Sequence, residues 1–108
     1  MTPVDEPDDA ARLLSHDPHI DLPNRILLTD RLEVAIAQAQ RYEHRAALVI
    51  IDLNKTTEVR AVLGLDAGQE LTRMVSDHLK LFARKSDTLA YIGSDLFAIV
   101  MPQVRDLP

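Results

Sequence analysis

Eight residues near the middle of the chain, AALVIIDL at 46–53, constrain the fold more than any other stretch. They form a continuous apolar run rich in β-branched side chains, and the run includes one acid, Asp52, near its end. Such a run is typical of a central strand that is buried on both faces of a sheet. A chain of 108 residues is long enough to build one modest core around that strand. The sequence therefore predicts a single α/β domain in which residues 46–53 are the central strand.

Helices are predicted on both sides of this strand in the sequence. Apolar residues recur at helical spacing over residues 23–43, and either Asp21 or Asn24 could supply the capping oxygen at the start. Residues 54–64 fit a short helix, and residues 66–82 fit a longer amphipathic one. Amphipathic helices of this kind cover the faces of a sheet, which supports the α/β assignment.

A β-hairpin is predicted in the last part of the chain. Strand-like segments at 88–92 and 96–101 flank the turn Gly93-Ser94-Asp95. If this hairpin pairs beside the central strand, Asp52 and Asp95 come to the same edge of the sheet. Ligands of α/β sheets gather at strand ends of that sort, so this edge is the candidate functional site.

Composition excludes several classes of function. The net charge is −5 and no face rich in Lys or Arg is evident, which argues against nucleic acid as a partner. There is no cysteine, so disulfides and thiolate metal sites are excluded, and no apolar stretch reaches membrane-spanning length. We expect a cytoplasmic chain without membrane insertion, with an acidic linker and short helix at 1–15 and one domain at 16–108.

Four segments, in order and at matching spacing, resemble the GGDEF family, the diguanylate cyclase domains that join two GTP into cyclic di-GMP. DPHIDLPNR at 17–25 is similar to the family's entry to its first helix, and IIDLNKTTEVRAVLGLDAGQEL at 50–71 to its metal- and guanine-binding stretch. RKSD at 84–87 matches the product-inhibition motif, and GSDLF at 93–97 occupies the signature. The resemblance implies an α/β (α+β) fold with a nucleotidyl-cyclase palm-like sheet and a ferredoxin-like core flanked by helices, truncated after the signature hairpin. The sequence stops before the family's final helices and strands, either as a fragment of a longer protein or as a truncated form that completes its sheet in another way.

The resemblance also implies which residues would hold metal. In the family, carboxylates and a backbone carbonyl bind Mg²⁺ together with the triphosphate. The matching positions are Asp52, the carbonyl of Leu53, and Asp95. We expect no cofactor other than Mg²⁺, and Mg²⁺ only if a vestigial nucleotide site persists. Alternatively, Asp52 simply ends a strand and Asp95 is an ordinary turn aspartate.

Other positions depart from the family pattern. Leu96 stands where the family has the acid implicated in activating the attacking hydroxyl, and leucine cannot accept a proton. Ser94 replaces the second signature glycine, whereas Gly93 and Phe97 are retained. The resemblance therefore implies a degenerate signature, and we expect no catalytic residue in this chain.

The nucleotide-binding positions are also altered. Arg60 and Gln69 replace the residues that read guanine, and Thr57 replaces the lysine that faces phosphate. Arg60 has a simpler interpretation as a solvated helix residue, and Gln69 as the returning half of a capping box with Asp66. These substitutions predict a degenerate nucleotide site.

One motif of the family is intact. Arg84 and Asp87 keep the spacing with which the family binds cyclic di-GMP, and arginine is well suited to forked contacts with guanine or phosphate. The alternative is an exposed turn with a weak ion pair.

We therefore expect a catalytically inactive GGDEF-like module that regulates or binds another protein in cyclic di-GMP signalling. The resemblance implies a protein partner or a flanking signalling domain of the EAL, PilZ or sensor type, and pairing of two copies into a homodimer is a further expectation. The alternatives are a cyclic di-GMP receptor acting through Arg84 and Asp87, or residual GTP binding or cyclase activity.

Overall fold

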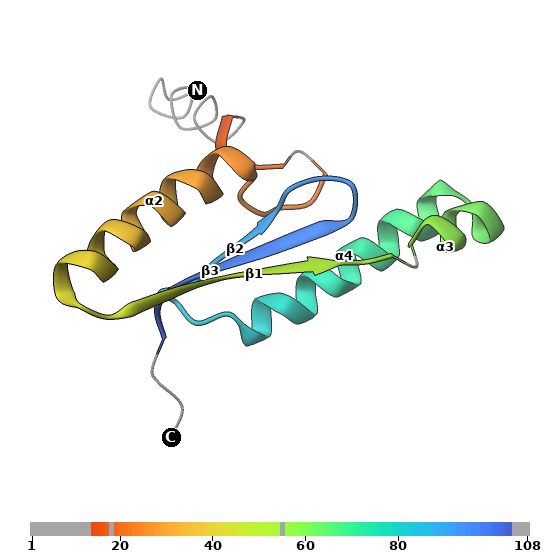
Figure 1. Cartoon of the computed structure of the whole chain (residues 1–108). Helices are drawn as coiled ribbons and strands as arrows, with labels where there is room; N and C mark the ends of the chain where they lie inside the picture. Colours follow the sequence, from red (N-terminus) through yellow and green to blue (C-terminus); the bar gives the residue numbers. More distant parts are fainter. Residues whose placement is uncertain (1–13, 18, 55, 105–108) are drawn as a thin grey trace, which may run out of the picture.

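The computed structural model describes residues 14–17, 19–54 and 56–104. The predicted linker and short helix at 1–15 lie outside these residues, except for Leu14 and Ser15, which are helical. The predicted order of helix, strand, helix, helix, strand, strand is confirmed (Figure 1). The elements are α2 (Arg25–Tyr42), β1 (Arg45–Asp52), α3 (Thr56–Leu63), α4 (Leu65–Phe82), β2 (Thr88–Tyr91) and β3 (Leu96–Val104).

The three strands form one antiparallel sheet in the order β1-β3-β2. The second strand of the hairpin, β3, therefore lies between β1 and β2. β1 pairs with β3 in a register that runs from Ala47 opposite Met101 to Asp52 opposite Leu96. The prediction that residues 46–53 form the central strand is wrong, because β1 has a single neighbour among the described residues. Its middle is accordingly open to solvent, and Ile50 is 51% exposed. The apolar composition of a strand indicates that its faces are packed against other elements. It does not indicate which strands are its neighbours in the sheet.

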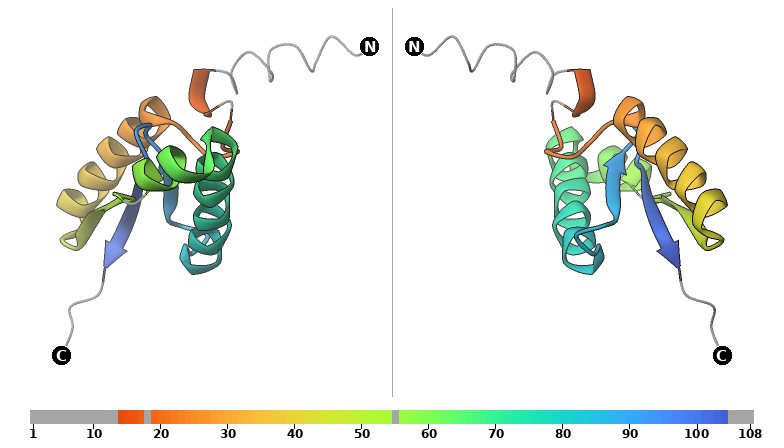
Figure 2. Two further views of the ribbon diagram at one scale, coloured as in Figure 1. Left: turned by 90° about the vertical axis from the view of Figure 1, so that its right-hand side faces the viewer. Right: turned by 90° about the vertical axis from the view of Figure 1, so that its left-hand side faces the viewer.

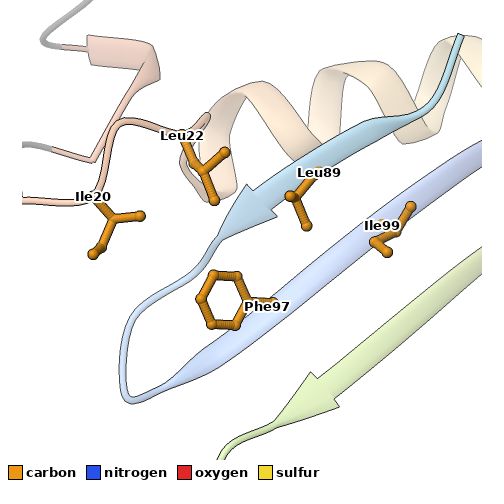
Figure 3. Packing of buried hydrophobic residues seen from close by; sticks show 5 residues of the cluster. All are labelled: Ile20, Leu22, Leu89, Phe97 and Ile99. Atoms are coloured by element: carbon orange, nitrogen blue, oxygen red, sulfur yellow. The ribbon is translucent and has the colours of Figure 1, made fainter. Parts of the chain in front are cut away.

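Helices cover both faces of the sheet, with α2 on one side and α4 on the other (Figure 2). On the α4 side, Phe97 and Ile99 of β3 pack with Leu89 of β2 and with Ile20 and Leu22 of the loop before α2 (Figure 3). On the α2 side, the core consists of Leu28, Ala35, Ala90, Ala98 and Val100. Successive side chains of β3 point to opposite faces of the sheet and so contribute to both cores. Every residue from Phe97 to Val100 is buried.

The helix ends decide between the predicted capping residues. Of the two candidates before α2, Asn24 is the N-cap, and its side chain accepts hydrogen bonds from the amides of Ile26 and Leu27. At α4 the N-cap is Gly64, with a φ of 96° and no side-chain cap. The capping-box interpretation of Gln69 is therefore wrong. Within the part of the chain that the structure describes, no helix is both long and apolar enough to span a membrane.

Candidate functional site

The signature turn directs one carboxylate into the protein. Gly93, Ser94 and Asp95 all have positive φ, at 85°, 52° and 60°, and the amide of Leu96 closes the turn by donating to the carbonyl of Gly93. Left-handed backbone is accessible to glycine and tolerated by aspartate. The side chain of Ser94 is exposed, whereas Asp95 is only 6% exposed. Asp95 is therefore a buried acid and not a solvated turn residue.

Four side chains from three elements surround the Asp95 carboxylate. Arg60 of α3 donates with both Nη atoms, Nη1 to Oδ2 and Nη2 to Oδ1, each at 2.7 Å. The hydroxyl of Thr56 donates to Oδ2. On Oδ1, Thr72 of α4 donates at 3.3 Å and the hydroxyl of Tyr91 at 3.4 Å. The acid thus joins α3, α4 and the end of β2, and the interpretation of Arg60 as a solvated residue is wrong.

These donors surround both oxygens of the carboxylate. An ionised carboxylate has about four lone-pair sites, and five donor groups approach it here. The forked pairing of a guanidinium with both oxygens is the strongest such arrangement. A divalent cation that bound both oxygens of Asp95 would have to displace the forked guanidinium of Arg60. The residues at Asp95 therefore do not fit Mg²⁺.

The Arg60 guanidinium, through its hydrogen bonds, holds the pKa of Asp95 below its usual value, and the Thr56 hydroxyl acts in the same direction against the effect of burial. The same hydrogen bonds raise the pKa of Arg60. Because the folded pKa of Asp95 is lowered, the stabilisation is present above its unfolded pKa of about 3.9. It is lost as the pH falls through the folded pKa.

Close packing of α3 against α4 fixes the position of Arg60. A Cβ placed on Gly68 would lie 2.3 Å from Cγ of Arg60 and 2.9 Å from its Nε. A real side chain cannot occupy that space without moving the arginine. Glycine at position 68 is therefore what allows Arg60 to cross α4 and reach Asp95.

We expect Gly68→Ala to lower the free energy of unfolding, although alanine is normally favoured over glycine inside a helix by about 1 kcal/mol. The reason is that the added methyl would push Arg60 away from Asp95. Urea unfolding checks this result. In an Arg60→Ala background the same substitution should instead stabilise the fold, and stabilisation with Arg60 present would contradict the packing argument.

The structure brings Asp52 and Asp95 to the same edge of the sheet, as predicted. Asp52 lies opposite Leu96, and the amide of Leu53 donates to the carbonyl of Asp95 at 3.0 Å. Asp52 itself is exposed and lines a hollow of about 260 Å³ with Leu53, Asn54, Thr56, Leu71 and Val75. Among the residues described, no group of three or more His, Cys, Asp or Glu side chains could hold a metal ion.

The altered nucleotide positions are only partly brought together. Arg60 and Gln69 line one cleft of about 180 Å³, whose other walls are Asp17, His19, Ile20, Thr72, Arg73 and Tyr91. Thr57 is exposed and does not line it. Sequence reasoning did not identify Thr72 or Tyr91, because neither carries a spacing signal that points to Asp95. In this cleft the guanidinium of Arg60 is hydrogen-bonded to the Asp95 carboxylate.

The Arg84 motif forms a compact turn between α4 and β2. The Asp87 carboxylate accepts from the backbone amide of Arg84 at 3.0 Å and from its guanidinium at 3.3 Å. The guanidinium also donates to the carbonyl of Gln103 on β3 at 3.1 Å. The side chain of Asp87 is 1% exposed and that of Arg84 59% exposed. The aspartate thus has a structural role in the turn, and only the arginine is available to a ligand.

Comparison with known proteins agrees with this architecture. The profile of the family described as "Diguanylate cyclase, GGDEF domain" matches residues 14–107. The bifunctional diguanylate cyclase/cyclic di-GMP phosphodiesterase MucR of Pseudomonas aeruginosa is 38% identical over 90 residues, which are 83% of this chain and 13% of that protein. The diguanylate cyclase TpbB of the same species is 30% identical over 97 residues, 90% of this chain and 22% of that protein.

Solved structures show the same fold. The isolated GGDEF domain of TpbB superposes with a TM-score of 0.81 at 28% identity, covering 84% of this chain and 53% of that one. A coiled-coil and GGDEF structure of DgcB from Caulobacter crescentus superposes with a TM-score of 0.88 at 22% identity, over 94% of this chain and 53% of that one. The chain belongs to the GGDEF domain family. It spans about half of these solved chains, and a smaller part of the curated relatives.

Proposed function

We propose that this domain is a catalytically inactive member of the GGDEF family that acts in cyclic di-GMP signalling by contacting another protein or domain. The observation that carries the proposal is the forked ion pair between Arg60 and Asp95. It places a fixed positive charge on the acid that, in the family, would bind a divalent cation. In this proposal the positive charge of Arg60 neutralises the carboxylate of Asp95 in place of a metal ion.

Two further features support the absence of catalysis. Leu96 follows Asp95 directly and offers neither a base nor a charge to a reacting hydroxyl. Gln69 and Arg60 line one cleft and stand at the positions where the resemblance implies guanine readers. A site built on polar readers loses affinity steeply when those readers are replaced. Metal binding, base recognition and proton transfer would each have to be restored before GTP could react.

A role in protein contacts is supported by the relatives. MucR is named as both a diguanylate cyclase and a cyclic di-GMP phosphodiesterase, so a domain like this one occurs there with a second activity. The diguanylate cyclase SiaD of Pseudomonas aeruginosa, 25% identical in sequence, was solved in complex with its activator SiaC. Both cases favour a partner protein or a flanking domain for this chain.

We expect the purified chain to make no detectable cyclic di-GMP from GTP and Mg²⁺, as measured by chromatography of the products. Leu96→Glu alone should not restore synthesis, because Arg60 would still hold Asp95 and the guanine readers would still be absent. Product formed by the wild-type chain and abolished by Asp52→Ala would refute the proposal. Asp52 is the appropriate control, since it is exposed and has no part in the Asp95 cluster.

A second candidate function is cyclic di-GMP reception through Arg84. The observation that favours it is the exposed guanidinium of Arg84, held in place by Asp87 and the carbonyl of Gln103. A single exposed arginine cannot desolvate so large a dianion, so we expect weak or undetectable binding in calorimetry with the chain. A dissociation constant of about 1 μM or tighter, lost in Arg84→Ala, would make reception the leading function.

A further inference from the structure

Leu14 and Ser15, here called the entry segment, are helical and lie beside the start of α2 (Figure 1). Two hydrogen bonds from a single residue hold them there. The backbone amide of Asn24 donates to the carbonyl of Ser15 at 2.7 Å, and its side-chain Nδ2 donates to the carbonyl of Leu14 at 2.9 Å. The entry segment is therefore attached directly to the N-cap residue of α2.

Asn24 uses both halves of its carboxamide. Oδ1 accepts from the amides of Ile26 and Leu27 at 3.0 and 3.2 Å, which caps α2. Nδ2 donates in the other direction, to the entry segment. Aspartate caps a helix about as well as asparagine, but an ionised carboxylate has no donor. Either residue would therefore cap α2, whereas only asparagine of the two can also bond to Leu14.

The loop between the entry segment and α2 is bonded to itself and anchored in the core. The amide of Asp17 donates to the carbonyl of Leu22 at 2.9 Å. The Asp17 carboxylate accepts from the amides of His19 and Ile20, both at 2.8 Å. Ile20 and Leu22 are buried in the core on the α4 side of the sheet (Figure 3). Residues 16–24 contain two prolines and no glycine, so the loop lacks the composition of a flexible linker.

The same loop is joined to the hairpin that carries Asp95. The amide of Tyr91, the last residue of β2, donates to the carbonyl of Pro23 at 3.0 Å. The hydroxyl of Tyr91 accepts from the amide of Asp95 at 3.2 Å and donates to its carboxylate at 3.4 Å. Pro23 and Asn24 are adjacent in the sequence. Pro23 is therefore bonded to the hairpin, and Asn24 is bonded to the entry segment.

We infer that Pro23 and Asn24 form a rigid joint, which fixes the direction of the entry segment relative to the Asp95 turn. A flexible linker at this place would let the entry segment swing freely. With the joint, a displacement of the entry segment moves the Asp95 turn with it, and no change of conformation inside the domain is needed. This regulatory role rests on the proposed function: a protein or domain that contacts the Asp95 edge thereby orients the entry segment, and the reverse.

Distances between two spin labels, measured by pulsed electron paramagnetic resonance on the full chain, test the joint. The chain has no natural cysteine, so labels can be placed at Leu14→Cys and Ser94→Cys, both at exposed positions. The reference pair is Ile26→Cys with Ser94→Cys, which reports on α2 and the hairpin alone. We expect the first pair to give a distance distribution as narrow as the reference. Adding Asn24→Asp should broaden the first distribution and leave the reference unchanged, because a carboxylate oxygen would repel the Leu14 carbonyl while still capping α2.

Hydrogen exchange tests the other half of the joint, the bond between Tyr91 and Pro23. We expect the Tyr91 amide to exchange as slowly as the amides inside β3. Exchange of this amide at the rate of an exposed one would overturn the inference. A broad distribution for the Leu14 pair without Asn24→Asp, or equal widths with and without it, would do the same. These measurements involve neither GTP nor catalysis, so their failure is distinguishable from a failure of the proposed function.

Discussion

Asp95→Ala is expected to destabilise the fold strongly, by about 2 kcal/mol in the free energy of unfolding. The carboxylate is buried and is the point at which Arg60, Thr72 and Tyr91 meet. Without it, donors around a buried position lose their common acceptor, and the turn loses the group that ties it to α3 and α4. For a domain of this size the melting temperature should fall by roughly 10 °C.

Asp52→Ala is the matched control for this experiment. Asp52 lies at the same edge of the sheet and is also an aspartate at a strand end, but its side chain is exposed. Its removal should change stability by no more than about 0.5 kcal/mol. Equal effects of the two substitutions in thermal or urea unfolding would show that Asp95 does not have the structural role assigned to it.

The sequence predicted the type and order of the elements because the helical and strand periodicities are strong. Among the described residues, the predicted central place of β1 in the sheet is wrong, and the reason is physical. A continuous apolar run such as residues 46–51 indicates that both faces of a strand need cover, but pairing depends on which other strands are present. In this structure β3 takes the central position, since β1 and β2 both pair with it.

The site was predicted in part. The spacing placed Asp52 and Asp95 at one edge of the sheet, and the structure agrees. The pairing of Arg60 with Asp95 was not predicted, because 35 residues separate them and no local pattern connects a helix residue with a hairpin turn. The sequence also did not predict that the Arg60–Asp95 pair depends on Gly68, because this dependence arises from the close approach of α3 and α4. Contacts of this kind follow from the fold and cannot be read from spacing.

Arg60 gives the buried acid Asp95 a cationic partner from within the chain. Arg60 stands at a position where the family resemblance implies a base-reading residue, and it supplies a permanent positive charge, because guanidinium stays protonated at all physiological pH values. The guanidinium of Arg60 stabilises the buried carboxylate of Asp95 through its own two hydrogen bonds. We therefore expect the domain to fold and function in its proposed role without metal or nucleotide.

The second large effect is expected from removing that arginine. In Arg60→Asn, the Asp95 carboxylate would lose its forked partner, and its oxygens would become available to a hard cation. Asp52 and the carbonyl of Leu53 lie at the same edge of the sheet and could complete the ligand set. We expect this variant to bind divalent cations that the wild-type chain does not bind, and Asp52→Ala in the same background should weaken that binding.

Titration with Mn²⁺, followed by NMR, tests the central claim most directly, because the paramagnetic ion broadens the amide signals of residues close to it. For the wild-type chain we predict that the amides of Leu53, Asp95 and Leu96 remain sharp at sub-millimolar Mn²⁺. In Arg60→Asn the same amides should broaden selectively. Selective broadening of these signals in the wild-type chain, at the same Mn²⁺ concentrations as in Arg60→Asn, would contradict the claim that Arg60 occupies the metal position.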